Sequence, residues 1–244
     1  MTARPDRFVA SPNHDERPPG TEISLLVVHS ISLPPGEYGG DAIERLFTNR
    51  LDPAAHPYFR EIAALRVSSH FLIRRGGELL QFVPLERRAW HAGVSHWRGH
   101  SALNDRSIGI EIVNPGHEWG YRCFPALQMA AVCDLCLAIL GRHAIPTRNV
   151  VGHSDVAPDR KQDPGELFDW PGLAMNGVGL WPDAAPQTEP ADDVPGALRA
   201  IGYGEADLAV TLRAFQRHWL PEAITGKADE ATRARLRAVV EAMA

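Results

Sequence analysis

The sequence has few cysteines, no long apolar run and no excess of positive charge, and each lack excludes a class of protein. Three cysteines among 244 residues are too few for a fold held together by disulfide bonds. No stretch approaches the roughly 20 consecutive apolar residues that a transmembrane helix needs, so we expect no membrane span. Asp and Glu number 30 against 25 Lys and Arg. This balance argues against a nucleic-acid partner, because phosphate binding needs concentrated positive charge.

The N-terminal residues also lack the features of a targeting signal. Residues 1–12 are polar and contain Pro5 and Pro12, whereas a secretory signal needs an apolar segment there. We therefore expect a cytoplasmic protein, and we expect it to be a monomer. A periplasmic or cell-wall location is the alternative if a signal preceded this chain.

Cys133 and Cys136 form a Cys-x-x-Cys pair, which is compatible with a redox or zinc-binding role. Both lie in the apolar segment 125–140, which we predict to be a helix with Pro125 in its first turn. The sequence has no second cysteine pair that would complete a structural zinc site. Because free cysteine is a frequent core residue, we expect both to pack in the core.

Strand and helix patterns follow one another along the first 181 residues. The apolar run 25–29 indicates a buried strand, and 107–114 alternates with isoleucine on one face, which places Glu111 on the other. Segments 68–75 and 78–84 are predicted to pair as a hairpin through a two-residue turn at Gly76-Gly77. Helices are expected over about 41–47 and 125–142, and a short strand over 149–151. This order predicts an α/β (α+β) fold with a mixed β-sheet flanked by helices.

The composition changes after residue 181, which divides the chain into three parts. We expect a main domain over 1–181 and a proline-rich, acidic linker over 182–194. Residues 195–244 are predicted to form a small three-helix module, with helices over 195–201, about 205–219 and 230–243. The evidence is apolar residues that recur at helical spacing.

A histidine and a carboxylate share the short segment 150–165. His153 and Asp163 stand ten residues apart, among glycines and prolines that we expect to hold the segment out of helix and sheet. His29 ends the strand 25–29 and is a candidate for a third ligand. Two histidines and one carboxylate suit zinc and leave a fourth tetrahedral position open for water, as in catalytic zinc sites.

Four segments then occur in an order that is typical of one family: Val27-Val-His29, Arg88-Ala-Trp-His-Ala-Gly93, Ser107-Ile-Gly-Ile-Glu111 and residues 150–165. Over about residues 5–182 the chain resembles the zinc-dependent N-acetylmuramoyl-L-alanine amidases of the AmpD/AmiD type. The resemblance implies the amidase/peptidoglycan-recognition fold and one zinc ion held by His29, His153 and Asp163. It also implies hydrolysis of the amide between N-acetylmuramic acid, including its 1,6-anhydro form, and L-alanine. The substrate would be peptidoglycan or muropeptide, in cell-wall recycling or turnover.

The same resemblance assigns roles to five further residues. Glu111 would activate the water as a general base and then donate a proton, and Lys161 would stabilise the oxyanion together with zinc. Arg66 would grip a carboxylate of the stem peptide. Trp90 and His91 would line the groove for sugar and peptide.

Two alternatives stay open at this point. The C-terminal helices resemble the peptidoglycan-binding module of many cell-wall hydrolases, which implies tethering to polymeric wall, but a helical cap packed on the main domain is also possible. For the whole chain, the alternative is a non-catalytic peptidoglycan-recognition protein on the same fold. Such a receptor is expected to lack some of the ligands, Glu111 or Lys161. The sequence does not distinguish soluble anhydro-muropeptides from polymeric peptidoglycan as the preferred substrate.

Overall fold

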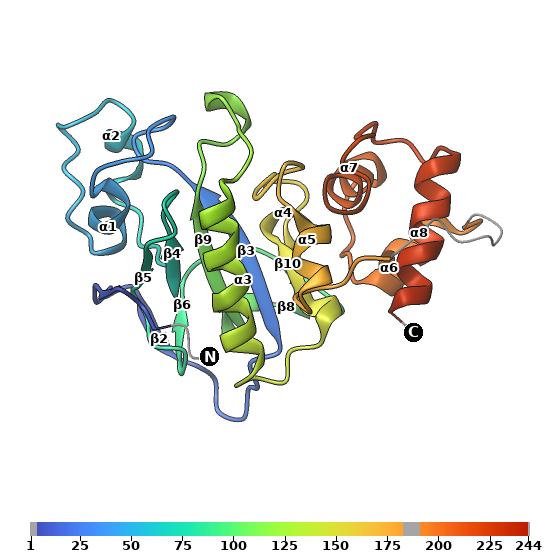
Figure 1. Cartoon of the computed structure of the whole chain (residues 1–244), viewed down its shortest axis with the longest axis horizontal. Helices are drawn as coiled ribbons and strands as arrows, with labels where there is room; N and C mark the ends of the chain where they lie inside the picture. The colour runs from blue at the N-terminus through green and yellow to red at the C-terminus, as the bar shows by residue number, and fades with distance from the viewer. Residues whose placement is uncertain (1–3, 183–190, 244) are drawn as a thin grey trace.

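A six-stranded mixed β-sheet forms the centre of the fold (Figure 1). The computed structural model describes residues 4–182 and 191–243. The strand order is β1-β5-β4-β9-β3-β10, and every neighbouring pair is parallel except β4 with β5. These strands are β1 (Arg7–Phe8), β3 (Leu25–Ile31), β4 (Phe71–Ile73), β5 (Leu79–Gln81), β9 (Ser107–Val113) and β10 (Val150–Gly152). The expected mixed sheet is therefore confirmed.

Two small antiparallel sheets and eight α-helices complete the described part of the chain. The sheets pair β2 (His14–Glu16) with β6 (Arg87–Ala89), and β7 (His96–Trp97) with β8 (His100–Ser101). The helices are α1 (Ala42–Phe47), α2 (Phe59–Ile62), α3 (Ala126–Leu140), α4 (His153–Val156), α5 (Trp170–Met175), α6 (Val194–Ile201), α7 (Leu208–Trp219) and α8 (Glu230–Ala242). Within residues 4–182 and 191–243, none of these helices is long and apolar enough to cross a membrane.

The alternation of side chains along β3 and β9 separates the two faces of the sheet. Ile108, Ile110 and Ile112 belong to the apolar core that also contains residues of α3, the helix that runs across this face in Figure 1. His29 and Glu111 are register partners of the parallel β3–β9 pair. Because successive side chains in a strand point to opposite faces, both lie on the face away from α3. The predicted orientation of Glu111 is confirmed.

The hairpin between β4 and β5 forms as expected, but the predicted two-residue turn is wrong. The backbone N–H of Arg74 donates to the Glu78 carbonyl, and that of Gly77 donates to the Arg74 carbonyl. Three residues therefore separate the last paired residues. Gly77 has a φ of 91° and Gly76 does not have a positive φ, whereas a two-residue type I′ turn needs positive φ at both positions.

The two cysteines of the Cys-x-x-Cys pair lie on α3. Cys136 is fully buried in the core beneath the helix, and Cys133 is partly buried against the same core. All three cysteines of the chain are free thiols. The prediction of core packing is confirmed for this pair.

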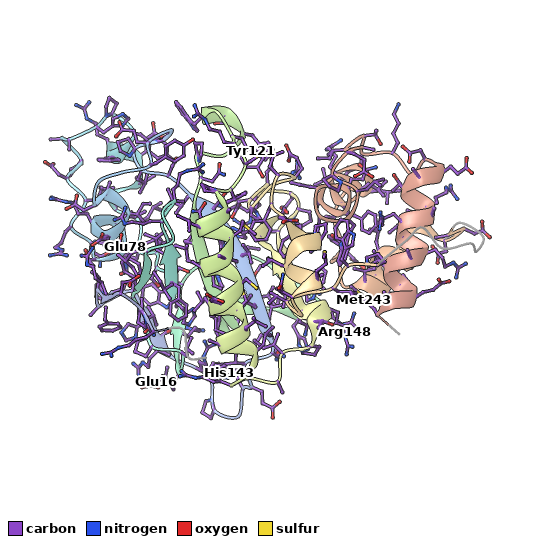
Figure 2. The ribbon with its side chains drawn as sticks, in the orientation of Figure 1. Glu16, Glu78, Tyr121, His143, Arg148 and Met243 are labelled. Carbon is purple, nitrogen blue, oxygen red and sulfur yellow. The ribbon has the colours of Figure 1, made fainter. Side chains whose placement is uncertain are left out.

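The C-terminal helices lie beside β10, α4 and α5 (Figure 1), and their bounds agree closely with the three predicted helices. Side chains fill the space between α7 and the neighbouring helices α4 and α5 (Figure 2). One apolar core includes Val27, Val151 and Val156 together with Phe215 and Trp219 of α7. The predicted linker 182–194 lies mostly outside the described residues. The helices and the main domain thus share a core, whatever the structure of the segment that joins them.

Candidate metal site and catalytic cleft

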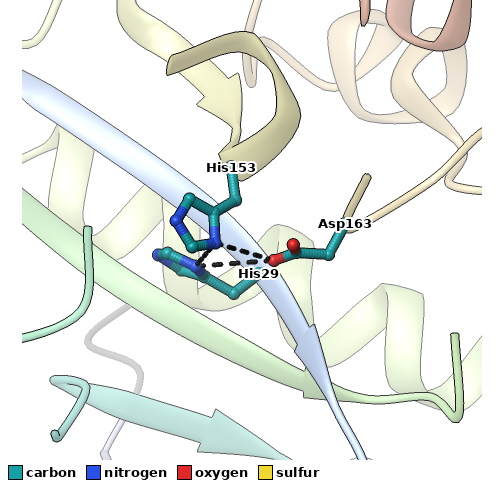
Figure 3. Close-up of side chains that lie close together, drawn as sticks. All are labelled: His29, His153 and Asp163. Atoms are coloured by element: carbon teal, nitrogen blue, oxygen red, sulfur yellow. Dashed lines mark hydrogen bonds and ion pairs between the residues drawn. The ribbon is translucent and has the colours of Figure 1, made fainter. Parts of the chain in front are cut away.

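Three predicted metal ligands converge on the face of the sheet away from α3 (Figure 3). Nδ1 of His29 lies 2.9 Å from Nδ1 of His153. Oδ2 of Asp163 lies 3.1 Å from Nδ1 of His153 and 3.6 Å from Nδ1 of His29. These separations match a zinc site, because tetrahedral ligands about 2.1 Å from the ion stand about 3.4 Å apart. The donor set therefore fits the predicted metal.

The segment 150–165 was predicted to lie outside helix and sheet, and for the residues around His153 that prediction is wrong. His153 is the first residue of the four-residue helix α4. Gly152 precedes it, and its backbone N–H donates to Oδ2 of Asp155 over 2.7 Å. A side chain at position 152 would stand 2.8 Å from Cδ of Pro164. Glycine therefore lets residue 152 and Pro164 approach each other, while Asp155 caps the start of α4.

Tyr121 holds the far end of the same loop, which we call the metal loop (residues 152–167). Its hydroxyl donates to the Pro164 carbonyl and accepts the backbone N–H of Leu167, over 2.8 and 2.9 Å. Gly165 has a φ of 92°, and an added Cβ there would overlap the Tyr121 ring. The backbone N–H of Ser154 also donates to the Asp163 carbonyl. These bonds fix Asp163 relative to His153.

A chain of hydrogen bonds behind His29 determines which of its nitrogens faces the site. The Ser107 hydroxyl donates to the Leu103 carbonyl, so its oxygen accepts Nε2–H of His91 over 3.0 Å. Burial holds the pKa of His91 well below its usual value, so Nδ1 of the neutral ring accepts Nε2–H of His29 over 2.9 Å. Burial lowers the pKa of His29 to about 4. Nδ1 of the neutral His29 therefore directs a lone pair toward His153 and Asp163, as a metal ligand requires.

The glycine at position 109 makes this chain of hydrogen bonds possible. A Cβ on Gly109 would lie 2.6 Å from Cγ of His91. Any larger residue at position 109 would displace the His91 imidazole and break its hydrogen bond to His29.

We expect His91→Phe to weaken zinc binding by about tenfold. Phenylalanine keeps a ring beneath Gly109 but cannot accept the proton of His29. The measurement is zinc affinity by competition with a chromogenic chelator. Trp90→Phe is the control, because Trp90 bonds through Nε1 to Asp15 and not to a ligand. Equal zinc affinity in the two variants would contradict the role assigned to His91.

The carboxylate of Asp163 is ionised at neutral pH. Burial alone would raise its pKa, but His153 and His29 hold the pKa of Asp163 well below its ordinary range. A neutral His29 beside an ionised carboxylate is the protonation state that binds a divalent cation.

Glu111 differs from Asp163 in its electrostatics. Burial, with the Asp163 carboxylate as a further cause, raises the pKa of Glu111 to about 8, although Lys161 opposes the shift. Its Oε2 atom is buried and has no hydrogen-bond partner among the described residues. A carboxylate in this state is suited to exchange protons near neutral pH.

A cavity of about 340 Å³ opens beside these residues. Six of the eight residues predicted from the sequence line it: Trp90, His91, Glu111, His153, Lys161 and Asp163. His29 lies beneath them, almost fully buried. Arg66 is not among the lining residues. It is exposed and donates to the carbonyls of Ala64 and Leu65.

Two other histidines have structural partners. His70 accepts the backbone N–H of Gly109 and contacts the Arg87 carbonyl. His218 lies near the end of α7. It is 2 % exposed, and its Nδ1 lies 2.6 Å from Oδ2 of Asp155. Sequence reasoning assigned no role to Asp155, although an acidic residue three positions after Gly152 is a recognisable helix-capping signal.

Comparison with known proteins places this site in a family. The profile of the N-acetylmuramoyl-L-alanine amidase family matches residues 19–166. The chain is 52 % identical over 165 residues to the 1,6-anhydro-N-acetylmuramyl-L-alanine amidase AmpD of Salmonella typhimurium. That alignment covers 68 % of this chain and 86 % of the relative.

Two solved structures extend the similarity toward the C-terminus. The structure of AmpDh3 from Pseudomonas aeruginosa is 31 % identical, covers 91 % of this chain and 93 % of its own, and gives a TM-score of 0.75. Escherichia coli AmiD, solved with anhydro-N-acetylmuramic acid-L-Ala-D-γ-Glu-L-Lys, is 31 % identical with a TM-score of 0.71. It covers 93 % of this chain and 92 % of its own.

Proposed function

The chain belongs to the N-acetylmuramoyl-L-alanine amidase family, and on that premise we propose that it is a zinc enzyme that cleaves soluble muropeptides. The bond cleaved is the amide between N-acetylmuramic acid, including its 1,6-anhydro form, and L-alanine. The observation that carries the proposal is the convergence of His29, His153 and Asp163 beside a cavity that Glu111 and Lys161 line. A recognition protein without catalysis would not need this complete set.

His29, His153 and Asp163 would hold one zinc ion per chain. When bound, zinc supplies Lewis acidity toward water and toward the amide carbonyl. Glu111 stands on β9 at the register position of His29, and it lines the cavity with an oxygen that has no hydrogen-bond partner within residues 4–182 and 191–243. Its raised pKa lets it take a proton from the attacking water and return that proton to the leaving amine of L-alanine.

Lys161 lines the same cavity and contributes a positive charge to it. Its ammonium group is suited to stabilise the negative charge that develops on the carbonyl oxygen in the tetrahedral transition state. The amide nitrogen leaves as a neutral amine, so no other charge needs compensation at this stage.

We expect Lys161→Met to lower kcat by about 10²- to 10³-fold while zinc content stays unchanged. Methionine keeps most of the aliphatic stem and removes only the charge. Lys161→Arg, which retains a positive charge, should lose less. If the methionine variant turns over at near the normal rate, Lys161 has no part in stabilising the transition state.

The substrate is supported by the relatives, since one is named for the 1,6-anhydro compound and another was solved with an anhydro-muropeptide. The direct test incubates the zinc-loaded protein with purified anhydro-muropeptide and, separately, with intact sacculi. Mass spectrometry should find free stem peptide with an N-terminal L-alanine. Binding without any cleavage of either substrate would favour the non-catalytic recognition protein instead. A cytoplasmic location and a monomeric state stay predictions.

A further inference from the structure

We propose that the C-terminal helices are part of the active-site architecture, because Tyr203 and His218 hold Asp155 and thereby position the metal loop. This inference rests on the proposed function. It assigns Tyr203 and His218 as positioning residues, which do not touch substrate or metal. It also goes beyond both alternatives that the sequence left open, a module that tethers polymeric wall and a helical cap that only packs on the main domain.

Asp155 is a buried polar contact between the two parts of the chain. Its side chain is fully buried, two residues beyond His153 on α4. Oδ1 accepts the Tyr203 hydroxyl over 2.6 Å, and Oδ2 accepts both the Gly152 backbone N–H over 2.7 Å and Nδ1 of His218 over 2.6 Å. Among the described residues, two of the three donors to this carboxyl group therefore come from the C-terminal part of the chain: Tyr203 from the connection after α6 and His218 from α7.

The two donors are themselves held rigidly by aromatic contacts. The ring of His218 stacks on Trp170 and on Trp219, with centroid distances of 4.0 Å in both pairs. The Tyr203 ring packs edge-on against Trp97 at 5.3 Å. Both residues are 2 % exposed. Such donors have fixed positions, so they determine where the Asp155 carboxyl group can lie.

Loss of these donors would move the metal loop. A buried carboxyl group with one remaining donor is strongly disfavoured and must shift until water or another donor reaches it. Asp155 caps the start of α4 through Gly152, so its movement displaces the turn that begins with His153. Ser154 is bonded to the Asp163 carbonyl, so the displacement reaches a second ligand.

The same interface offers a matched control at a distance from the metal loop. The Arg98 side chain donates to the carbonyls of Ala200 and Ile201, over 3.1 and 2.8 Å. Arg98→Leu therefore removes two hydrogen bonds between the same two parts of the chain. Neither of these bonds involves the metal loop.

The experiment compares three variants of the full-length protein with the unchanged protein: Tyr203→Phe, Tyr203→Phe/His218→Phe, and Arg98→Leu. Phenylalanine keeps the aromatic packing at both positions and removes only the donors. The measurements are zinc affinity by chelator competition, kcat and KM for soluble anhydro-muropeptide, and Tm. We expect the double variant to bind zinc about tenfold more weakly, with a lower kcat. Tyr203→Phe should show a smaller loss in the same direction, and Arg98→Leu should lower Tm without changing zinc affinity.

The outcomes separate this inference from the proposed function. If the unchanged protein binds zinc and cleaves muropeptide, but the double variant keeps its zinc affinity within twofold, the helices are only a packed cap and the inference is wrong. An equal loss of zinc affinity in Arg98→Leu would contradict it as well. If the double variant does not fold, Tyr203→Phe decides, because it keeps every apolar contact: unchanged zinc affinity there overturns the inference. An inactive, zinc-free unchanged protein would instead contradict the proposed function.

Discussion

Replacing Glu111 with glutamine is expected to lower kcat by about 10²- to 10⁴-fold while the protein keeps its zinc. Glutamine has the shape of glutamate but cannot accept a proton from water or return one to the leaving amine. Glu111 stands outside the cluster of three ligands, so its loss should not release the metal. KM should change little, because the proposed role begins after substrate is bound.

Steady-state kinetics with soluble anhydro-muropeptide, together with zinc analysis of the same sample, check this prediction. Glu111→Asp is a useful companion, because it keeps the carboxylate and shortens its reach by one methylene. It should retain more activity than the glutamine variant. A glutamine variant with normal kcat would show that another group handles the protons.

Replacing His153 with alanine is expected to abolish both zinc binding and activity. The substitution removes one of three converging ligands and leaves His29 and Asp163, which cannot hold zinc firmly as a pair. The chain should remain folded, since the core on either face of the sheet consists of other residues. The measurements are zinc content, hydrolysis rate and the circular dichroism spectrum.

His100→Ala provides the control for that substitution. His100 is exposed on β8 and lies outside the ligand cluster, so zinc content and rate should match those of the unchanged protein. A His153→Ala protein that still carried one zinc and hydrolysed muropeptide would refute the ligand assignment.

Local sequence patterns predicted the orientation of Glu111 better than the backbone around His153. The alternation of isoleucine along β9 was enough to place Glu111 on the face opposite Ile110, because a strand buried on one face has an apolar side chain at every second position. The helix that begins at His153 was missed. Four residues are too few to show a helical period, and the glycine and prolines around them indicated a loop.

The contacts of the C-terminal helices could not be predicted from local patterns. The spacing of Leu212, Phe215 and Trp219 was sufficient to predict α7, because one helix face is buried. The partner of that face was not predictable. Tyr203 and His218 meet Asp155 across 48 and 63 residues of sequence, and a single histidine on an apolar helix face gives no sign of what it contacts. The expectation of a tethering module came from family resemblance and from the composition of the linker, and neither indicates what the helices contact.

The exposed position of Arg66 could not be predicted for a similar reason. Its assignment came from family resemblance, whereas the direction of a long side chain depends on neighbours that composition does not reveal. In this structure the guanidinium bonds to backbone carbonyls of its own segment. Recognition of a stem-peptide carboxylate by Arg66 therefore stays a prediction.

Titration of metal-stripped protein with zinc, followed by the rate of muropeptide hydrolysis, tests the central claim most directly. The account predicts no hydrolysis by the stripped protein, a linear recovery as zinc is added, and saturation at one equivalent per chain. His153→Ala should recover nothing across the same titration. Full activity in the stripped protein, with no response to added zinc, would contradict the claim that this cleft is a zinc amidase site.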